Sequence, residues 1–205
     1  MKQKLPLRYA TLMRLVRAIH ANAVRLFLDA CALNRIGSFP SAYAISILAY
    51  EELGKMEMVD HVGFEEMFNG RARMTPQRME HLFSRKMFYS HRNKQSWGVN
   101  RRPDGSPVPK AEQRIYDGKL ESDKQNALYV GFIAGRIHNP SRFRASHVRK
   151  QLRYALQAFV EIADIPFYSV ADGSTSATRR RAQKIIDTLQ AEFNSCTRHA
   201  NRTKA

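Results

Sequence analysis

One segment of the chain combines a histidine with the cations that phosphate chemistry requires. His91 lies between Arg85 and Lys94 in a strongly basic stretch. Metal-free cleavage of RNA needs a base for the ribose 2′-hydroxyl, an acid for the departing 5′-oxygen and cations around the phosphorane. Histidine suits the proton transfer, while arginine and lysine suit the phosphate. We therefore predict catalytic roles for Arg85, His91 and Lys94.

The spacing of arginine and histidine does not identify this site by itself. Similar pairs occur at Arg14/His20 and Arg142/His147. His20 falls within a regular amphipathic pattern, which favours a packing or surface role. A lone histidine on a helix is usually structural, and this alternative holds for His91 as well.

Two adjacent acids, Glu51 and Glu52, precede Lys55 in an apolar segment. At about 100° per residue, Glu52 falls near the middle of the apolar stripe, so we expect it to be buried and paired. Glu51 and Lys55 are four residues apart, which indicates a solvated salt bridge. A catalytic role for Glu52 is one interpretation of such an acid. An interior ion pair that fixes helix register explains Glu52 equally well.

A second cluster of positive charge lies further along the chain. Residues 142–153 carry five cations and no acid. Such clusters usually contact nucleic-acid phosphates. We predict RNA binding by Arg142, Arg144, His147, Arg149 and Lys150.

The composition narrows the possible classes of protein. The 205 residues include 34 Lys+Arg and 18 Asp+Glu, which gives a net charge of +16 and points to a polyanionic partner. The longest apolar run, 42–50, is far shorter than the roughly 20 residues of a membrane span. The motifs of P-loop nucleotide sites, zinc proteases, serine hydrolases and diiron bundles do not occur. We expect a cytoplasmic protein without a membrane segment, metal or cofactor, and with both cysteines reduced.

Apolar residues recur at helical spacing through most of the chain, which predicts an all-α bundle. We expect a single domain over residues 1–205. Its predicted elements are helices at about 7–35, 38–59, 75–93, 120–135, 148–162 and 174–197, a mobile loop at 95–119 and a frayed basic tail at 198–205.

Several ordered blocks of residues resemble the AbiV abortive-infection family across about residues 20–140. They are Asn22-Ala23, Leu28-Asp29-Ala30, Glu51-Glu52-Leu53-Gly54-Lys55, Phe88-x2-His91-x2-Lys94 and Lys124-x2-Ala127-Leu128-Tyr129-Val130. This family belongs to the HEPN-like all-α proteins, many of which are metal-independent, dimeric RNases of antiphage defence. The resemblance implies a HEPN-like helical bundle with additional C-terminal helices. It also places Arg85 and His91 on the HEPN motif. Glu52 and Lys94 would be their catalytic companions, and Glu51 and Lys55 would have supporting roles.

The leading hypothesis is a toxin-like endoribonuclease that acts on RNA as a homodimer, with a phage protein as a possible activator or inhibitor. Residues six apart on a straight helix differ by about 120° and 9 Å, so Arg85 and His91 would share a site only across a two-fold axis. The alternative is a non-catalytic dimeric binding module that captures a phage protein or RNA. DNA binding is a third, weaker possibility, because no recognition-helix pattern stands out.

Overall fold

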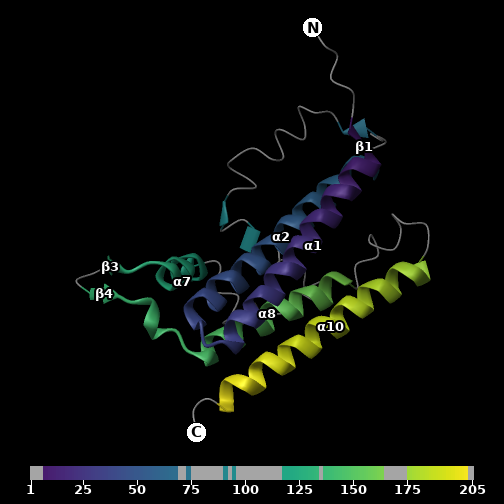
Figure 1. The fold of residues 1–205 in the computed structure, drawn as a ribbon. Helices are drawn as coiled ribbons and strands as arrows, with labels where there is room; N and C mark the ends of the chain where they lie inside the picture. Colours follow the sequence, from purple (N-terminus) through teal and green to yellow (C-terminus); the bar gives the residue numbers. More distant parts are fainter. Residues whose placement is uncertain are drawn as a thin grey trace.

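A computed structural model describes residues 7–68, 73–74, 90–91, 94–95, 117–133, 136–163 and 175–202 of the chain. Within these ranges the fold is helical, which confirms the all-α prediction (Figure 1). The helices are α1 (Tyr9–Arg35), α2 (Phe39–Phe68), α7 (Lys119–Leu128), α8 (Ala145–Ala163) and α10 (Thr175–Arg202), with the short 3-10 helix η1 (Pro140–Arg142). Single helical positions also occur at residues 91, 94 and 95.

Helices α1 and α2 form the predicted antiparallel hairpin, with Gly37 at the turn. Gly37 has φ 80°, a left-handed conformation that glycine adopts without a Cβ penalty. The amide of Ser38 donates to the carbonyl oxygen of Leu33 at 2.9 Å and closes α1. Pro40 occupies the first turn of α2, where its missing N–H costs nothing.

Helix α2 lies at the centre of the bundle, because it packs against α1, α7 and α8 (Figure 1). The shared core includes Phe27 of α1, Leu53 of α2 and Leu152 of α8, all fully buried. Helix α10 covers α1 and α8 and adds Leu189. Since α2 is enclosed by several helices, a residue on it can be buried on a side that faces away from α1.

The junction of α1 and α10 is polar as well as apolar. Asn34 donates its side-chain amide to the carbonyl oxygen of Cys196 at 3.1 Å, and Arg35 pairs with Glu192 at 2.6 Å. Cys31 and Cys196 are buried free thiols. A hydrogen bond with Cys196, together with burial, raises the pKa of Cys31, so this thiol stays protonated.

One predicted helix is shorter than expected. The helical pattern at 120–135 ends at Leu128, and residues beyond it form an antiparallel hairpin of β3 (Gly131–Ile133) and β4 (Arg136–His138), with Phe132 opposite Ile137. Gly131 disfavours a helix and the β-branched and aromatic residues around it favour strands, which explains the change. A second short ladder joins β1 (Leu7–Arg8) to β2 (Arg73–Met74).

Other boundaries differ from expectation, and some lie outside the described residues. Helix α2 extends to Phe68 and α10 to Arg202, so α10 does not fray at residue 198. Most of the predicted helix 75–93 and loop 95–119 belongs to the undescribed part of the chain. Where the chain is described there, the amide of Lys94 donates to Ser90 at 3.1 Å, which closes a helical turn, and Gln95 is helical.

Replacing Gly37 should destabilise the α1–α2 turn through backbone conformation alone. A Cβ at Gly37 would meet nothing within 4 Å. Gly37→Ala should therefore lower the free energy of unfolding by about 1–2 kcal/mol. Gly37→Asn should lower it by less, because asparagine tolerates the left-handed region. Urea denaturation of both variants measures this difference. Equal losses would show that the conformation of Gly37 does not limit stability.

Candidate functional site

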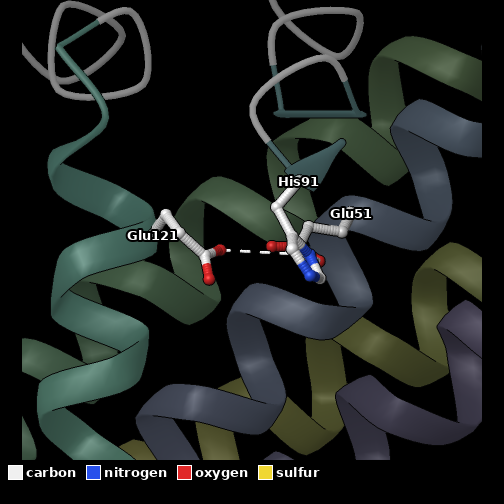
Figure 2. A group of neighbouring side chains, drawn as sticks. All are labelled: Glu51, His91 and Glu121. Atoms are coloured by element: carbon white, nitrogen blue, oxygen red, sulfur yellow. Dashed lines mark hydrogen bonds and ion pairs between the residues drawn. The ribbon is translucent and has the colours of Figure 1, made fainter. Parts of the chain in front are cut away.

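The centre of the site is the carboxylate of Glu51, which is buried in the middle of α2 at 2% exposure. Its Oε2 lies 2.7 Å from Nδ1 of His91 (Figure 2). Its Oε1 accepts from Nε2 of Gln95 at 2.7 Å and from Nζ of Lys124 at 2.9 Å. A buried carboxylate is tolerated only with such partners. Glu51 thereby links α2 and α7 to His91 and Gln95.

Lys124 of α7 is the cation of this cluster, and its side chain is 3% exposed. Besides Glu51, its ammonium lies 2.7 Å from Oε2 of Glu121 and 3.0 Å from Nδ1 of His91. One ammonium therefore faces two carboxylates. Nδ1 of His91 thus lies close to one ammonium and two carboxylates.

The side chain of His91 is 42% exposed, so the ring is accessible to solvent although Nδ1 faces the buried cluster. Nε2 makes no hydrogen bond with any residue that the structure describes. A proton on Nδ1 is donated to Glu51 and leaves Nε2 with a lone pair. A proton on Nε2 lets Nδ1 accept from Lys124 instead. The network thus supports both a proton-accepting and a proton-donating Nε2.

Glu121 remains ionised within the cluster. Burial acts to raise the pKa of Glu121, but hydrogen bonds from Lys124 and Gln125 and the charges of Lys124 and His91 together lower it. Gln125 donates to Oε1 of Glu121 at 2.8 Å. Glu121 is therefore a second negative charge near His91, 3.9 Å from Nδ1 (Figure 2).

Three further predicted residues surround the cluster. Glu52 accepts from the side-chain amide of Asn22 at 3.2 Å and pairs with Lys55 at 3.4 Å. Lys94 lies three residues after His91, on the same side of the helical turn. Burial is the main cause that lowers the pKa of Lys94, while the nearby charges of Glu51 and Glu52 oppose this effect. The structure therefore brings together Glu51, Glu52, Lys55, His91 and Lys94.

The predicted environments of the two adjacent acids were wrong, because they are interchanged in the structure. Glu51 is the buried acid, whereas the side chain of Glu52 is 18% exposed, and Lys55 pairs with Glu52 instead of Glu51. The cause is the central position of α2, which is covered by α7 and α8 as well as by α1. Arg85 lies outside the described residues, so its role stays a prediction.

Three members of the cluster were not predicted from the sequence: Gln95, Glu121 and Lys124. Lys124 carried a usable signal, because it lies on the buried stripe of α7 with Leu120 and Ala127. A cation on a buried stripe requires a buried acid nearby. Gln95 and Glu121 carry no comparable signal.

Donor atoms of Glu51, His91 and Glu121 lie within 4.8 Å of one another, close enough to hold a metal ion. Nitrogen and carboxylate oxygen donors suit zinc and similar ions. However, the ammonium of Lys124 lies within 3.0 Å of one donor atom on each of the three residues. The amine of Lys124 therefore occupies the position that a cation would take between these donors.

The predicted RNA-binding residues lie on η1, in the short link that follows it and on the first half of α8. Arg142, Arg144, His147 and Lys150 are exposed and Arg149 is half-buried. The 3-10 helix η1 packs against both α2 and α7, the helices that carry Glu51 and Lys124. None of the described helices is long and apolar enough to cross a membrane.

Comparison with known proteins places the chain in a family. The family model HEPN_AbiV, described as AbiV, matches residues 11–159, a range that contains every residue of the Glu51 cluster. No curated protein and no solved structure matches the chain. Because the family model covers well over half of the sequence, this chain belongs to the AbiV family of HEPN-like proteins.

Proposed function

We propose that this protein is an abortive-infection endoribonuclease that cleaves RNA without a metal ion and thereby blocks phage propagation. The observation that carries the proposal is the pairing of His91 with the buried carboxylate of Glu51, which leaves Nε2 of the accessible ring open to a substrate. A carboxylate that orients a histidine and stabilises its protonated form is a recurring catalytic arrangement. Family membership supports a function of this type.

In the proposed reaction, Nε2 of His91 removes the proton of a ribose 2′-hydroxyl. The 2′-oxygen attacks the adjacent phosphorus, and the bond from phosphorus to the 5′-oxygen breaks. Glu51 and Glu121 stabilise the imidazolium that forms, since a carboxylate oxygen of each lies within 3.9 Å of Nδ1. The products are a 2′,3′-cyclic phosphate and a 5′-hydroxyl.

Lys94 is our candidate for the acid that protonates the departing 5′-oxygen. Burial lowers the pKa of Lys94, which brings its ammonium closer to the neutral range where acid catalysis is most effective. Lys55 and Arg85 would add positive charge at the phosphorane. The charge of Lys124 is neutralised by Glu51 and Glu121, so we assign it a positioning role.

We further propose that the protein acts in the cytoplasm as a homodimer, as the family resemblance implies. The two-fold axis would bring Arg85 of one subunit toward His91 of the other. The cations on η1 and α8 would hold the RNA backbone, because they are exposed and adjacent to α7. A phage protein would activate or inhibit the enzyme.

A second candidate function is capture of a phage protein or RNA by a non-catalytic dimer, in which the Glu51 cluster is scaffolding. The observation that favours it is an exposed apolar strip beside the β3–β4 hairpin, which projects from one side of the bundle (Figure 1). Leu128, Tyr129, Val130 and Ile137 are all exposed there. Contiguous exposed apolar residues often mark a protein interface.

Removing His91 or its carboxylate partner should abolish cleavage. His91→Ala should lower the rate by about 10²–10⁴-fold, the usual contribution of a general base, and Glu51→Gln should reduce it in the same direction. Glu192→Gln is a matched control, because that acid pairs with Arg35 far from His91. The measurement is RNA cleavage by purified, folded variants. Cleavage by His91→Ala at the wild-type rate would reject the proposed base and favour the binding module.

Removal of metal ions should leave the activity intact. Because the amine of Lys124 lies among the three donor residues, we expect the same cleavage rate with and without EDTA. Zn²⁺ or Mn²⁺ added after EDTA treatment should give no stimulation. An activity that EDTA abolishes and one divalent ion restores would show instead that the donors hold a metal in solution.

The wild-type rate should decline as pH rises through the lowered pKa of Lys94, because an acid must be protonated to act. Lys94→Arg keeps the charge but cannot release its proton, so cleavage of ordinary RNA should fall by about 10²-fold. A substrate with a 5′-thio leaving group needs no acid and should recover the rate. Lys119→Arg, at an exposed site on α7, is the control. A loss that the thio substrate does not rescue would exclude Lys94 as the acid.

A further inference from the structure

A cavity separate from the Glu51 cluster lies where α2, α7, η1 and α8 meet. Its volume is about 320 Å³, within the range of about 300–1,000 Å³ that small-ligand sites occupy. The residues that matter for its chemistry are Asn126, Arg142, Phe143, His147, Lys150 and Gln151. Among the described residues, none that contacts the Glu51 carboxylate lines this cavity.

Gln151 is the strongest indication that the cavity receives a ligand. The residue is only 4% exposed, and its side chain makes no hydrogen bond with any other described residue. Its amide atoms are not among the polar atoms that are sealed from solvent without a partner, so they face the cavity. The amide of Gln151 therefore offers a donor and an acceptor to whatever occupies the cavity. A ligand with a donor and an acceptor would pair with both.

An aromatic wall lies beside Gln151. The ring of Phe143 packs against Tyr43 with centroids 4.7 Å apart and against His147 at 5.9 Å. Phe143 is half-buried, so part of its ring remains available to the cavity. A nucleobase has the flat face that stacks on such a ring and the edge that hydrogen-bonds to an amide.

The mouth of the cavity is cationic. Arg142 and Lys150 are exposed and line it. Nδ1 of His147 accepts a hydrogen bond from the backbone amide of Arg144 at 3.1 Å, so the proton of the ring lies on Nε2. Nε2 is therefore a donor whether the ring is neutral or charged. Asp123 is the only acid among the lining residues.

We propose that this cavity binds a nucleotide, with its base on Phe143 and Gln151 and its phosphate on Arg142, His147 and Lys150. The nucleotide is either one unit of an RNA strand or a free nucleoside monophosphate. In the first case the inference rests on the proposed function and defines a subsite for base selection. Tyr43 and Glu51 are eight residues apart on α2, or about 12 Å, so one strand could reach both sites.

The test measures binding and does not depend on cleavage. The full chain is titrated by calorimetry with AMP, GMP, CMP, UMP and inorganic phosphate, and a His91→Ala background is titrated with a short mixed-sequence oligoribonucleotide. We expect a nucleotide or the oligonucleotide to bind at least tenfold more tightly than phosphate. Gln151→Leu should weaken that binding by about tenfold. Gln157→Leu, at an exposed position of α8 that pairs with Glu161, should not change it.

A second variant combines Arg142→Ala and Lys150→Ala. Both positions are exposed, so the substitutions should not disturb folding. This variant should also bind the nucleotide more weakly. If the variants bind mononucleotides more weakly than the wild type does, the site is assigned to a free nucleotide. If only their binding of the oligonucleotide is weaker, the site is assigned to RNA. Phosphate binding as tight as nucleotide binding, or binding that neither variant changes, would overturn the inference. An RNA cleavage activity that persists in that event would leave the proposed function standing.

Discussion

The burial of the Glu51 carboxylate is the constraint on which the rest of the site depends. A charge in the core of the bundle must be met by donors, and here they come from α7 and from the turn at residues 90–95. Loss of one partner of such a pair costs about 3–5 kcal/mol, so the cluster holds its elements in one register. The same contacts fix His91 with one nitrogen inside and one outside. Stability and the proposed chemistry therefore depend on the same carboxylate.

Lys124 supplies the positive charge at the centre of the site. Two carboxylates and a histidine could have formed a metal centre, but the amine on α7 lies between them. The site is consequently close to electrically neutral, since its acids and amines are nearly balanced. Under the proposed function, the net charge of +16 would attract RNA through other surfaces, such as the exposed cations of η1 and α8. The proposal thus assigns RNA attraction and the cleavage reaction to neighbouring but different residues.

Periodicity was sufficient to predict the α1–α2 hairpin, α8 and α10 as helices, although α2 is enclosed by three helices and buries more than one stripe. It failed where local structure or packing competes. Gly131 and its β-favouring neighbours end α7 early, and the enclosure of α2 exchanges the environments of Glu51 and Glu52. The histidine could be found from its cationic context and from family resemblance. Lys124 could have been found from its place on the buried stripe of α7, whereas Gln95 and Glu121 could not, since their contacts depend on how the chain packs against α2.

The chemical ends of the RNA products test the central claim most directly. Attack by the 2′-hydroxyl, with His91 as base, must leave a 2′,3′-cyclic phosphate on one fragment and a 5′-hydroxyl on the other. Mass spectrometry of a short RNA cut by the purified protein would identify both ends. Our account predicts the cyclic phosphate and the 5′-hydroxyl. Fragments with a 3′-hydroxyl and a 5′-phosphate would instead show attack by water and would contradict the role assigned to His91.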